Sequence, residues 1–116
     1  MNNERWTQVH KLLASATRGA GTGYTNAISV KSYHEALFFM ECTAVGGSST
    51  LDLTMQVSPD DGATWFDTAS VFVQSTGAVK RLLSSIMLGP LVRFSYTVAG
   101  TNTPTATFYL SGSFKT

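Results

Sequence analysis

The sequence of 116 residues contains little charge. Charged side chains make up 13% of it, about half of the usual share of about 25%. The basic residues outnumber the acidic ones by eight to seven, and Lys80 and Arg81 form the one adjacent basic pair. A nucleic-acid-binding protein normally carries a clustered basic face. The composition therefore argues against a nucleic-acid partner.

Cysteine and long hydrophobic runs are also scarce. Cys42 is the one cysteine, so the fold must hold without an intrachain disulfide, and its apolar surroundings indicate a buried small hydrophobe. A helix that spans a bilayer needs about 20 apolar residues in succession. No run in this sequence approaches that length, so we expect no membrane partner. Glu4 and Lys11 interrupt a segment that would otherwise resemble a signal peptide. We expect a chain that is made in the host cytoplasm and left unprocessed.

The sequence offers no pattern of catalytic or metal-binding residues. His10 and His34 are the two histidines, and neither has a second ligand at the spacing of a metal site. The paired carboxylates of Asp60 and Asp61 lie in a predicted turn, where both are solvated. No glycine-rich loop follows a strand and opens a helix, as a phosphate-binding loop would. We therefore predict a non-enzymatic protein with no catalytic residue, no metal and no cofactor.

The segment before Gly23 has the spacing of an amphipathic helix. Asn3 is a suitable cap and Gly19 a suitable stop. The apolar residues that recur at helical spacing are Trp6, Val9, Leu12, Leu13 and Ala16. Glycines in residues 19–23 indicate a flexible joint. We expect an N-terminal helix or arm with a glycine hinge over residues 1–23, and we expect Trp6, Val9, Leu12 and Leu13 to contact a partner.

From Tyr24 onward the pattern has a period of two, which is typical of half-buried strands. Apolar and polar side chains alternate most clearly in residues 28–31, 51–58, 92–98 and 106–114, and more weakly in residues 69–74 and 79–83. Turn signals separate these segments, in residues 46–49, 59–62, 76–77, 89–90 and 100–104. The spacing predicts an all-β domain over residues 24–116, a single β-sandwich or jelly roll of about seven to eight short strands.

Residues 36–45 break the alternation because both faces of this segment are apolar. Such a strand is either covered on both faces within its own fold or pressed against another subunit. Phe38 and Met40 are the candidates for that subunit interface, and a core position is the alternative for both.

Residues 58–65 match the pattern S-x-D-x-G-x-T-W, formed by Ser58, Asp60, Gly62, Thr64 and Trp65. The pattern resembles the Asp-box hairpin of sialidase propellers and of many unrelated β-proteins. Asp60 can accept hydrogen bonds from the turn backbone, Gly62 suits a tight turn and Trp65 can pack back across the hairpin. We interpret it as a rigid structural hairpin, with a calcium or sugar contact as the alternative. A sialidase needs several such boxes, and this chain is too short for them.

The part of the chain from Leu51 onward carries a wider resemblance. A strand enters the hairpin of residues 56–67, and residues 89–94, residues 95–101 and a closing strand rich in threonine and serine follow. This order is similar to that of small phage-encoded β-sandwich proteins in virion structural modules, including capsid decoration (cement) proteins. The resemblance covers a little over half of the chain and brings no set of functional residues with it.

The resemblance implies a protein on the capsid surface of a virion. Its partner would be the major capsid protein or another virion protein, and it would form a homo-oligomer, usually a trimer near a local threefold axis. One alternative is a tail, head-spike or fibre component. Another is a carbohydrate-binding module, in which exposed aromatic residues line a sugar platform. The aromatic candidates are Trp6, Tyr24, Tyr33, Phe38 and Tyr109.

Overall fold

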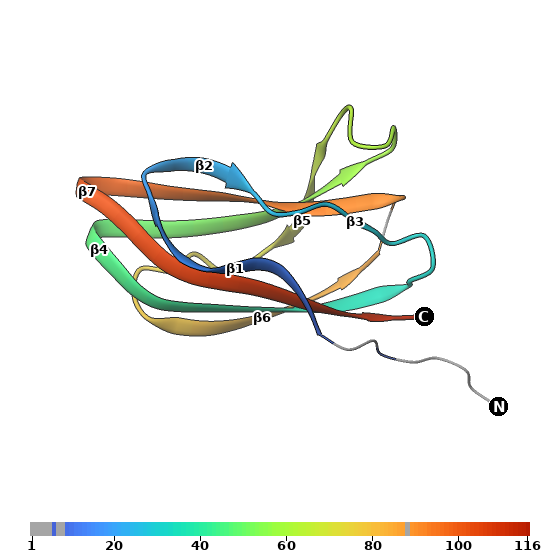
Figure 1. Cartoon of the computed structure of the whole chain (residues 1–116), viewed down its shortest axis with the longest axis horizontal. Coiled ribbons are helices and arrows are strands. Elements are labelled where there is room, and N and C mark those ends of the chain that lie inside the picture. The colour runs from blue at the N-terminus through green and yellow to red at the C-terminus, as the bar shows by residue number, and fades with distance from the viewer. Residues whose placement is uncertain (1–5, 7–8, 88) are drawn as a thin grey trace.

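The computed structural model describes residues 6, 9–87 and 89–116, and these residues form strands and loops with no helix among them. The strands are β1 (His10–Gly19), β2 (Gly21–Tyr24), β3 (Ile28–Ser29), β4 (Glu35–Ser58), β5 (Phe66–Val71), β6 (Val79–Ile86) and β7 (Leu91–Lys115). All pairings between them are antiparallel (Figure 1). Within the described residues no helix is long and apolar enough to cross a membrane. The predicted all-β class is confirmed.

The two long strands β4 and β7 form one ribbon that folds back on itself. They pair from Glu35 with Lys115 to Ser58 with Leu91, and the register shifts near Gly47. At that point both strands turn together at one end of the molecule (Figure 1). The ribbon thereby contributes to two layers of a sandwich. Residues 48–58 and 91–101 join β2, β3 and β5 in the β5 layer, and residues 35–46 and 105–115 join β1 and β6 in the β6 layer.

Glycine and serine build the corner between the layers. Gly47 and Gly100 have positive φ angles of 64° and 141°, and a Cβ on Gly100 would collide with the carbonyl oxygen of Ser48. The Ser49 hydroxyl donates to the Gly46 carbonyl and accepts a hydrogen bond from the Thr105 amide. Residues 46–49, with two glycines, and residues 100–104, with one, were predicted to be turns between short strands. That prediction is wrong, because they form a bend within continuous strands.

The core lies between the layers and consists of the inward side chains of both. The largest fully buried ones are Phe38, Phe94, Phe108, Phe114, Met40, Leu51, Leu53, Met55 and Leu110. Phe38 of the β6 layer meets Phe94 of the β5 layer edge to face, with 4.8 Å between ring centroids. Burial of each such side chain contributes about 1.5–3 kcal/mol. Cys42 lies in this core, and burial raises the pKa of its thiol.

The helix predicted before Gly23 is wrong for residues 10–19, which form β1 on the edge of β7. The register of β1 shifts between Lys11 and Leu13 and again between Leu13 and Ala16. These irregularities let Leu12 enter the core while its neighbour Leu13 packs against the core. Apolar residues at helical spacing can therefore be buried by an irregular strand as well as by a helix. The predicted cap at Asn3 lies outside the described residues.

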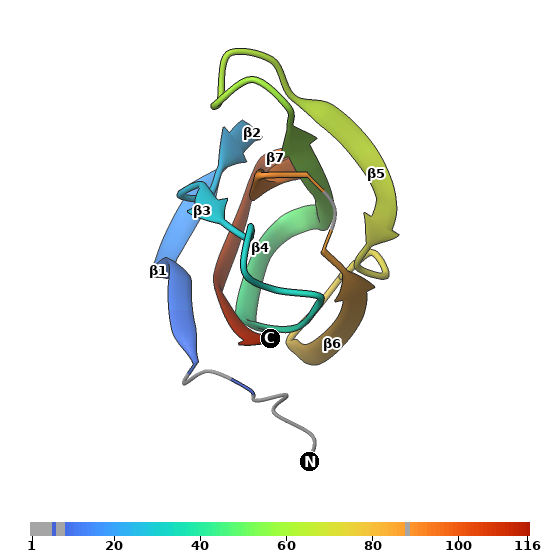
Figure 2. The same ribbon diagram turned by 90° about the vertical axis from the view of Figure 1, so that its right-hand side faces the viewer.

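The glycine segment after β1 carries the chain from one layer to the other. β1 pairs with β7 in the β6 layer, and β2 pairs with β7 in the β5 layer, with Gly21 opposite Val98. Figure 2, viewed down the long axis, shows β1, β2 and β3 on one side of the molecule and β5 and β6 on the other. Of the weakly predicted strands, residues 79–83 lie within β6 and are confirmed, whereas residues 69–74 overlap β5 only in residues 69–71. The division of the chain into units 1–23 and 24–116 stays a prediction.

Candidate functional site

The features of this structure that could serve a function are its surfaces. Among the described residues, no three His, Cys, Asp or Glu side chains lie together as the ligands of a metal ion would. The organised side chains outside the core lie on the outward faces of the two layers and in the turn at residues 58–65. We describe the β6 layer first.

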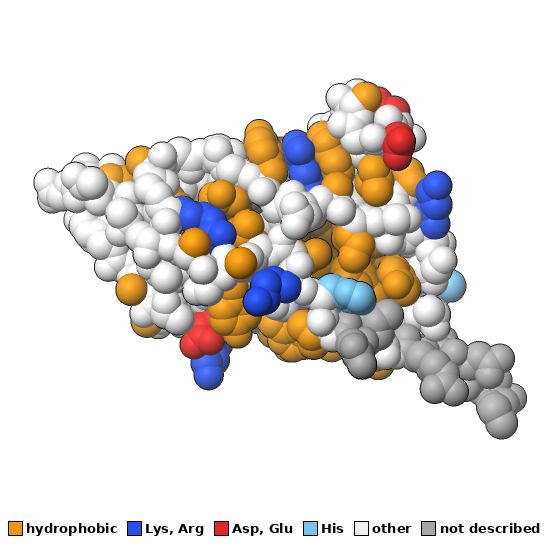
Figure 3. Space-filling model, in the orientation of Figure 1, with side chains coloured by type: hydrophobic (Ala, Val, Ile, Leu, Met, Phe, Trp, Pro, Cys, Tyr) orange, Lys and Arg blue, Asp and Glu red, His pale blue; other side chains and the backbone are white. Residues whose placement is uncertain are grey.

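Strand register places an apolar group on the outward face of the β6 layer. β6 pairs with the first half of β4, so that Leu82 lies opposite Phe39 and Lys80 opposite Glu41. Since side chains alternate between the faces of a strand, the inward neighbours of these residues fill the core and they themselves face out. Leu82 is 62% exposed and Ile86 is 67% exposed. Figure 3 shows hydrophobic side chains along the margin where Figure 1 places this layer.

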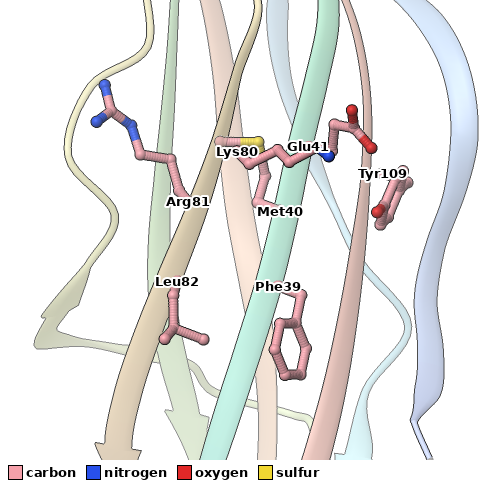
Figure 4. Close-up of a pocket in the computed structure, with 7 residues that line it drawn as sticks. All are labelled: Phe39, Met40, Glu41, Lys80, Arg81, Leu82 and Tyr109. Atoms are coloured by element: carbon pink, nitrogen blue, oxygen red, sulfur yellow. The ribbon is translucent and has the colours of Figure 1, made fainter.

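We call the outward group formed by Leu37, Phe39, Glu41, Lys80, Leu82, Ile86 and Tyr109 the β6 face. A hollow of about 260 Å³ lies between Phe39, Leu82 and Tyr109, and the charged residues Glu41, Lys80 and Arg81 also line it. Figure 4 shows Phe39 and Leu82 next to each other from neighbouring strands, and Glu41 next to Tyr109. Burial and the Glu41 carboxylate raise the pKa of the Tyr109 phenol. An apolar centre with charges at its rim is typical of a protein interface.

The predicted contact residues of β4 lie one position away from this face. Phe38 and Met40 are buried in the core, and Leu37 and Phe39 are the outward residues of the same strand. A run that is apolar on both faces cannot reveal which set of alternate residues points inward. Leu82 and Ile86 were not among the predicted contact residues. The alternation that continues to the end of β6 could have placed them on one face.

The predicted arm residues are divided between the core and the surface. Leu12 is buried and Leu13 is half-buried against the core, whereas Trp6 and Val9 are exposed. Trp6 forms an isolated bridge with Lys115, and the Lys115 ammonium lies 5.8 Å from the centroid of its ring. The structure therefore does not bring the four arm residues together on one surface.

The segment predicted as an Asp-box forms a turn that is closed by its own hydrogen bonds. The Ser58 hydroxyl donates to Asp60 Oδ1 at 2.9 Å, and the backbone amides of Gly62 and Thr64 donate to Ser58 Oγ and Asp60 Oδ1, each at 2.8 Å. Hydrogen bonds from Thr64 lower the pKa of Asp60. Asp61 and Gly62 have positive φ angles of 61° and 94°. The Asp60 carboxylate is thus engaged within the turn itself.

The chain is similar to known proteins in structure but not in sequence. No protein-family model matches the sequence, and no curated protein sequence matches it. In structure the chain is similar to the SPBc2 prophage-derived protein YomS, with 11% identity and a TM-score of 0.54 over 100% of this chain and 97% of that one. It is also similar to VP2 in the subviral particle of infectious bursal disease virus, with 11% identity and a TM-score of 0.65.

The two likenesses differ in how much of the other protein they cover. The match to VP2 spans 98% of this chain and 33% of that VP2 chain. A chain in the structure of the Gx strain of infectious bursal disease virus gives a TM-score of 0.59 over 32% of its length. The chain thus corresponds to about a third of VP2 and to nearly all of YomS. Likeness at these identities shows a shared β-sandwich fold.

Proposed function

We propose that this chain is a non-enzymatic structural protein of a virus particle that decorates the outer surface of a phage capsid and stabilises the shell. The sequence resemblance to phage virion proteins supports this proposal. A fold shared with a prophage-derived protein and with VP2 of a virus is consistent with it. A tail or head-spike component is the alternative within the same class.

The observation that carries the proposal is the β6 face. Leu82 and Ile86 are 62% and 67% exposed on β6, and among the described strands β6 pairs with β4 alone. An exposed apolar strand at the edge of a sheet favours association with another chain. Burial of each of the two side chains would contribute about 1.5–3 kcal/mol. We assign this face to contacts with virion proteins, including other copies of the chain.

The charges on the β6 face suit contact between copies. Glu41 and Lys80 lie opposite each other in the β4–β6 register. In a cyclic oligomer, Lys80 of each copy can therefore lie against Glu41 of the next copy, so that both charges of every copy are used once. Symmetric oligomers are built from such self-complementary or cyclic contacts. We favour the trimer that the sequence resemblance implies.

Substitution of Leu82 by glutamate tests the face. We expect the wild-type chain to sediment as an oligomer and Leu82→Glu to sediment as a folded monomer, because a charge on the face opposes association while an exposed position does not affect the core. Val73→Glu is the matched control, since Val73 is 69% exposed on the connection between β5 and β6. Sedimentation velocity over a range of concentrations, with circular dichroism of each variant, gives the answer. A wild-type chain that stays monomeric throughout would contradict the assignment.

Attachment to particles is tested separately. We expect the chain to co-sediment with purified particles from the cells that encode it, and Leu82→Glu to bind them more weakly. Electron microscopy of particles with the chain labelled then gives its position. Label on the capsid surface supports decoration, and label on the tail or on a head spike supports the alternative.

A further inference from the structure

A stacked arginine lies on the outward face of the β5 layer, away from the β6 face. The Arg93 guanidinium carbon lies 3.9 Å from the ring centroid of Tyr24 and 4.2 Å from that of Trp65. Arg93 Nε donates to Gln56 Oε1 at 2.8 Å, and Gln56 Nε2 donates to Asp67 Oδ1 at 2.9 Å. The rings of Tyr24 and Trp65 thus flank the guanidinium, and the side-chain amide of Gln56 accepts the hydrogen bond from its Nε atom.

Arg18 provides a comparison within the same molecule. Its guanidinium carbon lies 4.8 Å from the ring centroid of Phe108, and its Nη atoms donate to the backbone carbonyls of Ala14, Ala16 and Phe108. The Nη atoms of Arg93 donate to no acceptor among the described residues. The Nη donors of Arg18 are therefore used within the fold, whereas those of Arg93 are available to a ligand.

The free donors of Arg93 are suited to a carboxylate. A guanidinium presents its N–H groups in one plane, and two parallel hydrogen bonds from its edge match the two oxygens of a carboxylate. Tyr24 and Trp65 cover the faces of the Arg93 guanidinium, and Gln56 accepts the hydrogen bond from Nε. A carboxylate that approaches from solvent can therefore accept hydrogen bonds from the Nη atoms. The Gln56 amide lies between Asp67 and the guanidinium, so the chain's own carboxylate does not occupy this edge. Prior ordering of the side chain also lowers the entropic cost of binding.

The surroundings of Arg93 are those of a sugar-binding surface. Tyr24 is 51% exposed, and its ring can pack against the apolar face of a sugar. Hydroxyl groups lie along the same outward face: Thr22 and Thr97 share a hydrogen bond of 3.0 Å, and Ser95 lies opposite Tyr24 in the register.

We propose that Tyr24, Arg93 and Trp65 form a binding site for a carboxylate-bearing sugar, such as a uronic acid unit of an acidic polysaccharide. Arg93 binds the carboxylate, and the aromatic rings hold Arg93 in place while Tyr24 contacts the sugar ring. This site does not depend on the proposed role in a virion, since it lies on the opposite layer from the β6 face.

Fluorescence titration of Trp65 tests the site. In a Trp6→Phe background, which leaves Trp65 as the one tryptophan, we expect a saturable change with tetragalacturonate. The fully methyl-esterified tetrasaccharide, which keeps the sugar rings and loses the carboxylates, should bind at least tenfold more weakly. Arg93→Lys keeps the charge but loses the planar pair of donors, and it should also weaken binding of tetragalacturonate at least tenfold. Lys11→Gln on β1, in the other layer and outside the β6 face, removes a positive charge at an exposed position and should leave this affinity unchanged.

Several results would overturn the proposal. They are the absence of saturable binding, equal affinity for the ester, and an Arg93→Lys variant that binds as the wild type does. Binding of a glutamate-rich peptide or of phosphate as tight as that of tetragalacturonate would overturn the assignment to a sugar. Should Arg93→Lys fail to fold by circular dichroism, Gln56→Leu serves instead, because it keeps Arg93 and removes the acceptor that orients it. None of these results alters the sedimentation of the Leu82→Glu variant, so the two proposals fail independently.

Discussion

At the scale of single residues, a few polar side chains fix the turn that leads from β4 to β5. Ser58 and Asp60 take hydrogen bonds from the backbone amides of Gly62 and Thr64. The hydrogen bonds that Asp60 itself accepts, first those from Thr64 and then that from Ser58, favour its ionised form and lower its pKa from the ordinary value of 3.8. The stability of the turn is therefore linked to the charge of one carboxylate.

We expect Asp60→Asn to lower the free energy of unfolding at neutral pH and to lose this effect in acid. A carboxyl whose pKa is lower in the folded chain stabilises the fold above its unfolded pKa, and the contribution disappears as the pH falls below 3.8 through the folded pKa. Urea unfolding at a series of pH values from about 2 to about 7 measures the difference. Asp61→Asn is the control, since Asp61 makes none of the side-chain hydrogen bonds of the turn. A constant difference between Asp60→Asn and the wild type across this range would contradict the linkage.

At the scale of elements, the corner in the β4–β7 ribbon decides the architecture. β4 has 24 residues and β7 has 25, far beyond the usual length of about 3–10 residues for a strand. The ribbon can lie in both layers because four residues at the corner have positive φ angles, a region that residues other than glycine rarely reach: Gly47, Gly100, Asn102 and Thr103. The corner is thus the element that turns one sheet into a sandwich.

Substitution of Gly100 by alanine should destabilise the protein by at least about 2 kcal/mol, because a positive φ is strained for alanine and the new Cβ meets the Ser48 carbonyl. Gly19→Ala is the matched control, since a Cβ there has no neighbour within 4 Å. It should change stability by no more than about 0.5 kcal/mol. Chemical denaturation of both variants checks the pair. Equal stability of the two would show that the corner tolerates a side chain.

The elements also show how far the sequence could predict this structure. Alternating apolar residues predicted the positions of most strands, because a half-buried strand must alternate. The same rule could not show that β4 and β7 continue through residues 46–49 and 100–104, since glycine, asparagine and proline also mark ordinary turns. For β1, pairing with β7 outweighed a helical spacing of apolar residues. The β6 face was missed because residues 36–45 are apolar on both sides, and Arg93 was missed because its stacking partners come from distant segments.

At the scale of the whole molecule, the two outward faces differ in chemistry. The β6 face is apolar at its centre, whereas the face around Arg93 is polar with two aromatic rings. β1 completes the β6 layer by covering the edge of β7 and by placing Leu12 in the core. The N-terminal segment therefore belongs to the sheet in the described residues, and truncation becomes a test of the whole fold.

Deletion of residues 1–18 should cause loss of the folded state or aggregation. It removes Leu12 from the core, at a cost of about 2–5 kcal/mol by analogy with large-to-small substitutions. It also exposes the edge of β7 to other chains. Thermal unfolding and sedimentation of the truncated chain measure both effects, and deletion of residues 1–8, which spares β1, is the control. A stable, monomeric product of the longer deletion would support instead the predicted division at residue 23.

The central place of β7 has a consequence for how the protein is made. β1, β2 and β3 pair with β7 alone among the described strands, and Glu35 must meet Lys115 across most of the sequence. On the ribosome, the first three strands therefore wait without partners until residues 91–115 have emerged. Pairing between such distant segments is intrinsically slow. We infer that the sandwich closes only after β7 has been synthesised, because β1, β2 and β3 have no other pairing partner among the described strands.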